Sequence, residues 1–265
     1  MPKMKKYTQA GFTLVELVTV IILLGVVGTF SSRFIADNVV LYQSSVNQNE
    51  RLNDARFVLN RMSKELDSAI AFSVAEDSPV VGQSCIQFVP FTAAGQYLNS
   101  VAGETPIQLI MDPASRASGS AATGKFNGQR ISVLTTNSDD FYQPASGSIA
   151  IIDTYTVSGA NDTQAEVDLD STLTLDSAVS RYFIFEREVR YCLESNNSTL
   201  FRYEKVGNAM ETRVRMMGDL SSNSSMSLTS ATQFSNAILE LNFNFLLRGG
   251  SEIKFEHQVV MSNVP

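Results

Sequence analysis

The chain has 265 residues, of which 44% are apolar and 18% are charged, so it can bury a core of its own without depending on disulfides. Its formal net charge is −7, from 20 Lys and Arg against 27 Asp and Glu. This balance disfavours nucleic acid as a partner, because phosphates are neutralised by clustered basic side chains. We therefore expect an acidic, folded protein.

The first part of the chain predicts one membrane-spanning helix. Residues 12–30 read FTLVELVTVIILLGVVGTF, and a run of about 20 apolar residues is long enough to cross a bilayer as a helix. Lys3, Lys5 and Lys6 precede the run, and basic residues tend to stay on the cytoplasmic side. The chain after about Phe34 is therefore expected outside the cytoplasm.

One carboxylate, that of Glu16, interrupts the apolar run. An ionised carboxylate inside a bilayer costs about 2.5–3.5 kcal/mol on insertion scales, so such a residue usually has a partner. Two alternatives need no partner: the side chain reaches the interface, or it is protonated.

The segment KYTQAGFTLVEL, which begins at Lys6, resembles the type IV prepilin signature. The resemblance implies that a prepilin peptidase removes residues 1–11 by cutting between Gly11 and Phe12, and that Phe12 is then N-methylated. It also implies that Glu16 pairs with the N-terminal ammonium of a neighbouring subunit during assembly. Two opposite charges in lipid offset their desolvation cost by meeting, which agrees with this role.

Two other signals share a basic start and an apolar run. A secretory signal peptide is cleaved after the run at a small-x-small site, for which Val26 to Gly28 would serve, and a signal anchor is not cleaved. Neither requires Gly-Phe before the run or a carboxylate inside it. The prepilin interpretation is therefore preferred.

The helical pattern continues beyond the apolar run, with apolar residues at three- and four-residue steps and charged residues between them. The pattern predicts one helix from Phe12 to about Phe72. Its first half, 12–34, would span the membrane or lie in a filament core, and its second half, 35–74, would be amphipathic. A break near Asp37 and Asn38 is the alternative. The expected packing positions are Leu14, Val15, Leu17, Val18 and Val20 to Leu24 in the first half, and Leu52, Ala55, Leu59, Met62, Leu66 and Ala69 in the second.

After Pro79 the periodicity changes to two, and residues 80–265 predict a β-rich periplasmic domain. A Gly-Gly turn at 248–251 predicts a C-terminal hairpin, and stretches rich in small residues at 112–128 and 218–232 predict surface loops. The expected strands are Cys85–Phe91, Ile107–Met111, Arg130–Thr135, Ser148–Tyr155, Tyr182–Leu193, Leu200–Lys205, Ile238–Leu247 and Ile253–Met261. A long N-terminal helix packed on an antiparallel sheet is an α+β fold, as the prepilin resemblance also implies.

The chain has two cysteines, Cys85 and Cys192, and each lies in an expected strand. Because the domain is expected to be exported, we expect them to form a disulfide. Closing a loop of about 107 residues contributes roughly 4–5 kcal/mol on the chain-entropy model. Two free buried thiols are the alternative.

Candidate catalytic and metal-binding groups are few. His257, the single histidine, is in phase with apolar residues of the last strand, which indicates a core or edge histidine. The acidic stretches Asp139-Asp140 and Asp162 to Asp170 lack the spacing of a calcium loop, so solvated loop carboxylates are expected and calcium binding is the alternative. The sequence predicts no enzyme, no cofactor and no metal site.

Among prepilin-like proteins, the length of the chain favours a minor subunit. The stretches ARFVLNRMSKELDSA, SCIQFVPF, VRYCLESNNSTLFRYE and HQVVMSNVP are similar to MshO-type minor prepilins of the mannose-sensitive haemagglutinin (MSHA) pilus system. J-type minor pseudopilins of type II secretion and PilW-like minor pilins share the same plan and stay as alternatives, as does a tip adhesin.

The resemblance also implies partners and a location. The partners would be prepilin peptidase, other major and minor pilins through the N-terminal helix, and the inner-membrane assembly platform. The chain would lie in the inner membrane with its N-terminus cytoplasmic and its C-terminal domain periplasmic, and would then enter the pilus.

Overall fold

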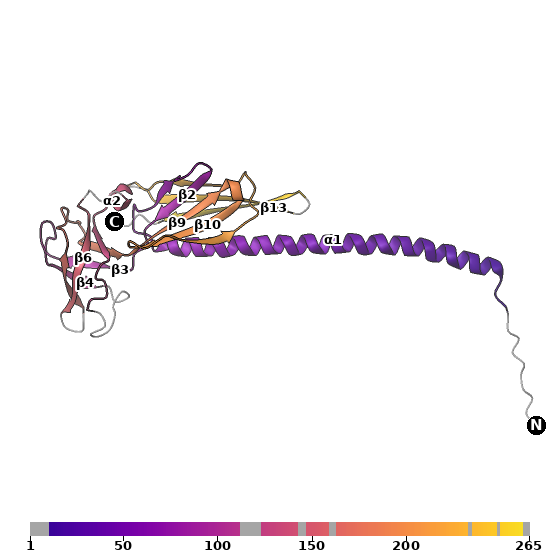
Figure 1. The fold of residues 1–265 in the computed structure, drawn as a ribbon, viewed down its shortest axis with the longest axis horizontal. Coiled ribbons are helices and arrows are strands. Elements are labelled where there is room, and N and C mark those ends of the chain that lie inside the picture. The colour runs from indigo at the N-terminus through magenta and orange to yellow at the C-terminus, as the bar shows by residue number, and fades with distance from the viewer. Residues whose placement is uncertain are drawn as a thin grey trace, which may run out of the picture.

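The computed structural model describes residues 11–111, 123–142, 147–158, 163–232, 235–247 and 250–261, except for the side chain of residue 197. The chain begins with α1 (Leu14–Asp67), a continuous helix of 54 residues. Figure 1 shows its N-terminal half projecting away from the rest of the molecule, which we call the head, residues 51–261. The predicted long helix is confirmed, and the alternative break near Asp37 does not occur.

The helix ends a few residues before the predicted Phe72. The backbone N–H of Ser68 donates to the carbonyls of Glu65 and Leu66, which closes the last turn. Ile70 then donates its N–H to the carbonyl of Val89, and Phe72 has a φ of 65°, in the left-handed region. The segment after α1 is therefore hydrogen-bonded to the chain that follows β2, and the helix does not continue through it.

Two antiparallel sheets pack on the C-terminal half of α1. The first has five strands in the order β1 (Ala75–Asp77), β2 (Gln83–Phe88), β9 (Arg187–Glu194), β10 (Thr199–Val206) and β11 (Thr212–Met217). The second has three strands in the order β12 (Ser225–Thr229), β13 (Ala237–Leu246) and β14 (Glu252–Met261). Both sheets share one core with α1, so the expected α+β arrangement is confirmed.

A closed barrel is inserted between β2 and β9. Its strand order is β3 (Ala93–Leu98), β4 (Ile107–Met111), β7 (Gln164–Leu169), β6 (Ile149–Ser158), β5 (Arg130–Val133) and β8 (Arg181–Phe185). The barrel has a separate core of its own, which includes Leu109, Ile152 and Ile184. In Figure 1 the barrel lies at the end of the molecule opposite the N-terminus.

A small third cluster joins the barrel to the helix and sheets. Ile70 follows α1, Val89 follows β2, and Phe185 ends β8; all three pack with Phe141 of the short helix α2 (Asp139–Tyr142). The hydroxyl of Tyr142 also donates to the carbonyl of Ser73 over 2.8 Å. Burial raises the pKa of this tyrosine well above its ordinary value, so the hydroxyl stays protonated and can donate.

Several sequence expectations need correction. The stretch 218–232 contains β12 and is not only a loop, and the expected strand Tyr182–Leu193 is two strands that separate at Glu186, where the chain leaves the barrel for the five-stranded sheet. Strands β1, β3, β7 and β11 also occur where no strand was expected. Residues 112–122 and 248–249 of the predicted loop and turn lie outside the described residues.

Candidate functional site

The exposed N-terminal half of α1 is the first candidate site. Among the described residues, α1 is the one helix long and apolar enough to cross a membrane, and its most apolar 18-residue stretch has no buried residue. Phe12, Leu24 and Phe30 are 79%, 65% and 71% exposed. Such a continuous apolar surface is not stable in water, so it needs lipid or other helices around it.

The start of α1 brings the predicted processing and pairing residues together. Thr13 is the N-cap in an extended conformation, and its hydroxyl accepts a hydrogen bond from the N–H of Glu16 over 3.3 Å. Gly11 and Phe12 lie before this cap, exposed and outside the helix. Glu16 lies in the first helical turn, where a negative charge interacts favourably with the helix dipole. Their roles in processing and pairing stay predictions.

A comparison with protein-family models matches residues 6–32 to the prokaryotic N-terminal methylation motif. The match covers the end of the basic leader, the Gly-Phe step and the whole apolar run of residues 12–30, including Glu16. The motif supports a type IV pilin-like prepilin. The single N-terminal apolar helix is consistent with a membrane-anchored protein of this kind. No curated protein and no solved structure matches the chain.

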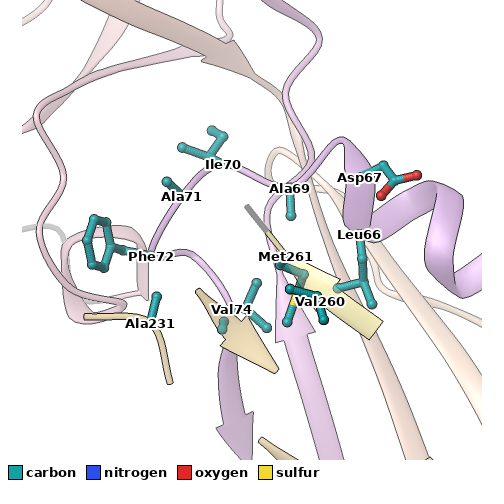
Figure 2. A pocket seen from close by; sticks show the side chains of 11 residues that line it. Leu66, Asp67, Ala69, Ile70, Ala71, Phe72, Val74, Ala231, Val260 and Met261 are labelled. Atoms are coloured by element: carbon teal, nitrogen blue, oxygen red, sulfur yellow. The ribbon is translucent and has the colours of Figure 1, made fainter. Parts of the chain in front are cut away.

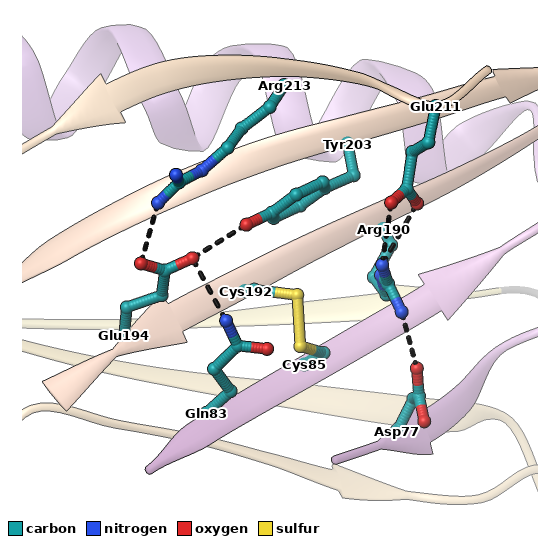
Figure 3. Close-up of a disulfide and its surroundings, with 9 residues drawn as sticks. All are labelled: Asp77, Gln83, Cys85, Arg190, Cys192, Glu194, Tyr203, Glu211 and Arg213. Atoms are coloured by element: carbon teal, nitrogen blue, oxygen red, sulfur yellow. Dashed lines mark hydrogen bonds and ion pairs between the residues drawn. A yellow bond between two sulfur atoms is a disulfide. The ribbon is translucent and has the colours of Figure 1, made fainter. Parts of the chain in front are cut away.

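Cys85 and Cys192 form a disulfide, as predicted. The two residues lie directly opposite each other on β2 and β9, and both are buried. Figure 3 shows the bond on the face of the five-stranded sheet that is turned away from α1. Because the barrel lies in the chain between β2 and β9, the disulfide joins the two strands between which the barrel is inserted.

Ionic contacts surround the disulfide on this outer face (Figure 3). The guanidinium of Arg190 on β9 donates to Asp77 on β1 over 2.9 Å and to both carboxylate oxygens of Glu211, next to β11, over 2.9 and 3.0 Å. One residue of the central strand therefore contacts both edges of the sheet. The sequence contained no signal for this group, because its members are far apart along the chain.

Glu194 forms a second group of contacts at the other end of β9. Its carboxylate accepts hydrogen bonds from Gln83 over 3.1 Å, Tyr203 over 2.6 Å and Arg213 over 2.7 Å. Burial and the hydrogen bond to this carboxylate raise the pKa of Tyr203, so the phenol stays a donor. Arg213 also lies over the ring of Phe201, 3.6 Å from its centroid. The carboxylate of Glu194 thus finds all three of these donors on strands of the same sheet.

A buried ion pair fixes α1 beneath the five-stranded sheet. The carboxylate of Glu65 on α1 accepts hydrogen bonds from Nε of Arg202 over 3.0 Å and from the hydroxyl of Tyr191 over 2.9 Å. The Arg202 side chain is only 4% exposed, and it also contacts Glu204 over 2.8 Å. This hydrogen bond holds the pKa of Glu204 below its ordinary value. Sequence reasoning missed the pair, although Arg202 is in phase with the inward-facing Leu200, and a charge at such a position indicates a buried partner.

The other polar residues singled out in the sequence lie on strands, at a helix start or outside the described residues. His257 lies on the edge strand β14 and is exposed, so the edge alternative is confirmed and the core alternative is wrong. The carboxylate of Asp140 is buried and accepts from the N–H groups of Thr136 and Asn137, so it is not a solvated loop carboxylate. Asp162 lies outside the described residues, and Glu166 to Leu169 belong to β7. No group of His, Cys, Asp or Glu able to hold a metal occurs in the described part of the chain.

A small cavity of about 110 Å³ lies where α1 ends. Figure 2 shows the side chains of Leu66, Val74, Val260 and Met261 around it, and every lining side chain except that of Asp67 is apolar. A cavity of this size holds about one side chain and presents no set of convergent polar groups. It therefore offers no arrangement for catalysis.

Proposed function

We propose that the chain is a minor prepilin subunit that takes part in the initiation or assembly of a type IV pilus of the MSHA type. In this proposal, prepilin peptidase cuts between Gly11 and Phe12, Phe12 is N-methylated, and the apolar half of α1 leaves the bilayer to pack with other pilins. The inner-membrane assembly platform would drive that step, and the head would lie in the periplasm before it enters the filament.

The observation that carries the proposal is the contrast within α1. Its C-terminal half is covered by the two sheets, with Val58 and Met62 buried, whereas its N-terminal half is covered by nothing in the described part of the chain. The uncovered part of such a helix can move from lipid into a bundle of neighbouring helices, and both surroundings are apolar. The apolar burial is kept in both states, so the exchange needs no unfolding of the head.

In this proposal, Glu16 makes the packing of the helix specific for a neighbouring subunit with a processed N-terminus. A carboxylate near the end of an apolar helix is costly in lipid, and the new ammonium of Phe12 on a neighbouring subunit is an opposite charge of suitable position. The proposed role is therefore charge pairing between subunits, with the surrounding apolar residues supplying contact area.

The MSHA assignment is supported by the four sequence stretches similar to MshO-type proteins and by the size of the head. A J-type minor pseudopilin of type II secretion, or a PilW-like minor pilin, is the alternative. Deleting the chain and measuring surface pili and secreted protein in parallel separates these systems: the proposal expects fewer MSHA pili with normal secretion. Normal pilus number with reduced secretion would reject it.

A tip adhesin is a second candidate because of the barrel. The barrel has its own core and lies opposite the N-terminus, which is the end of a subunit that a filament tip would expose (Figure 1). If the barrel binds a surface, replacing residues 93–185 by a short turn between β2 and β9 should abolish adhesion and keep pilus number unchanged. Phe88 and Val189 are paired, so a short connection can join these strands.

The test of the assembly role compares two helix variants in cells that make the pilus. Glu16→Ala should reduce the recovery of sheared filaments by at least about tenfold, since a buried charge pair is lost, while membrane insertion stays normal. Glu50→Ala, which removes an exposed carboxylate farther along the same helix, is the matched control and should have no effect. Equal filament recovery from the two variants would reject the pairing role.

A further inference from the structure

The link between α1 and β1, residues 68–74, contains a turn with strained backbone geometry. The N–H of Ser73 donates to the carbonyl of Ile70 over 3.0 Å and closes a turn with Ala71 and Phe72 at its centre. Phe72 has a φ of 65°, and it is the only aromatic residue with a positive φ in the described part of the chain. Turns with a positive φ at this position favour Gly or Asn, so a bulky side chain there is strained.

Hydrogen bonds hold the turn on both sides. Before it, the N–H of Ile70 donates to the carbonyl of Val89 over 2.9 Å. After it, the fully buried Ser73 accepts at Oγ from the N–H of Val89 over 3.1 Å, and its carbonyl accepts from the hydroxyl of Tyr142 over 2.8 Å. Tyr142 ends α2, which lies between β5 and β6 of the barrel. The last of these bonds therefore connects the turn to the barrel.

The barrel side of this hydrogen bond also contains a strained residue. Leu134 directly follows β5, begins the segment that carries α2, and has a φ of 48°. Strained residues persist where the surrounding contacts over-determine the backbone, and they concentrate at sites that change conformation. Strain therefore occurs on both sides of the Tyr142–Ser73 hydrogen bond.

The cavity of about 110 Å³ lies directly beside the turn. Ile70, Ala71 and Phe72 line it, together with Leu66 at the end of α1 and Met261 of β14. Phe72 is partly exposed, and Figure 2 shows its ring directed away from Leu66 and Met261. An apolar ring thus lies partly in water beside an apolar cavity, although its burial there would be favourable.

We propose that the link is a hinge with two positions, and that the Tyr142–Ser73 hydrogen bond holds it in the strained one. When this bond breaks, the turn leaves the positive-φ conformation, the ring of Phe72 enters the cavity, and the barrel is free to change its angle to α1. Strain relief and burial of the ring favour the second position, whereas the hydrogen bond favours the first. These contributions are similar in size, so loss of one bond changes which position is preferred.

The hinge lets the barrel move without unfolding either core. The helix and sheets share one core, and the barrel has another. Ile70 and Val89, which pack with Phe185 between these two cores, lie before the turn and keep their hydrogen bond, so they form the pivot. This inference goes beyond the proposed function and does not depend on it, because the head is the same with or without processing.

A single fluorescent reporter tests the movement of residue 72. The chain has no tryptophan, so Phe72→Trp in the full-length protein in detergent reports on this position alone. Adding Tyr142→Phe should shift the emission to shorter wavelength and reduce quenching by acrylamide, because the indole moves into the cavity. Arg130→Gln, which removes a different contact between barrel and sheet, from Arg130 to Glu188 over 2.8 Å, is the control and should change neither. Unchanged emission and quenching after Tyr142→Phe would overturn the proposal.

Two small residues at the same position test the strain without the bulky reporter. Glycine is less stable than alanine in most conformations, but this order reverses at a positive φ. Phe72→Gly should therefore melt about 2–4 °C above Phe72→Ala while Tyr142 is present. Adding Tyr142→Phe to both variants should abolish the difference, because the relaxed turn no longer needs a positive φ. A difference that persists without the hydroxyl, or that is absent from the first pair, would overturn the hinge.

Discussion

The two parts of α1 are one continuous helix, but they differ in what surrounds them. The C-terminal part, from Arg51 to Asp67, has a buried face, on which Ala55, Val58 and Met62 are at most 1% exposed. The longer N-terminal part, residues 14–50, has no buried residue. The C-terminal part is therefore stabilised by contacts within the chain, whereas the N-terminal part needs lipid or other subunits around its apolar residues.

The largest expected effect on the head comes from the disulfide. Replacing both cysteines, Cys85→Ser with Cys192→Ser, should lower the free energy of unfolding of the head by roughly 4–5 kcal/mol, because the bond closes a loop that contains the whole barrel. Urea unfolding of the full chain in detergent, followed by near-ultraviolet circular dichroism, measures this. Helix insertion into membranes should be unchanged, and a loss of insertion would show that the two halves are not independent.

A matched pair of leucines tests the comparison inside α1 itself. Leu59→Ala, at a position 5% exposed, should lower the free energy of unfolding of the head by about 3 kcal/mol, since it leaves a cavity in the shared core. Leu23→Ala, at a position 63% exposed, should leave head unfolding unchanged. The same urea titration serves both variants. Similar destabilisation by the two would contradict the division of the helix.

The ion pair under the sheet should contribute less. Glu65→Gln keeps an acceptor for Tyr191 but removes the charge that faces the buried Arg202, which keeps Glu204 as a partner. We expect a loss of about 2 kcal/mol, in the range of hydrogen bonds to charged groups. Arg61→Gln, which alters an exposed neighbour of the same carboxylate, is the control and should cost much less. A larger loss in the control would place the stabilising contact elsewhere.

The smallest effect is a pH dependence of the head. The hydrogen bond from Arg202 holds the pKa of Glu204 below its ordinary value of 4.5, so its contribution is complete above that pH and is lost as the pH falls through the lowered pKa. The melting temperature should therefore decline below about pH 4.5, and less steeply in Glu204→Gln. Equal declines in both proteins would assign the acid sensitivity to other carboxylates.

Local patterns in the sequence were sufficient for the helix and for many strands. The helix lacks Pro and Gly after Gly28, and β13 alternates Leu239 and Leu241 with polar residues, so each element is specified by its own residues. The motif at Gly11 and Phe12 is equally local, which is why the start of the chain could be interpreted in detail. The disulfide followed from two cysteines in expected strands of a domain that was expected to be exported.

The barrel could not be predicted from the same patterns. Its strands have the same period of two as those of the sheets, and the pairing of β2 with β9 joins segments about a hundred residues apart. Strands β3, β7 and β12 contain Gly, acidic residues or Ser, which have low strand propensity, and they are stabilised by their neighbours in the sheet. The contact of Arg190 with Asp77 depends on this pairing, because β2 lies between the strands that carry them, so it was missed with it.

The proposed processing is tested most directly by the intact mass of the chain from cells with and without prepilin peptidase. We predict that residues 1–11 are lost and one methyl group is gained, only when the peptidase is active, so that Phe12 becomes the N-terminus. An uncut chain, or cleavage after the apolar run, would contradict it, because the helix would then belong to an anchored or secreted protein and Glu16 would have no ammonium to meet.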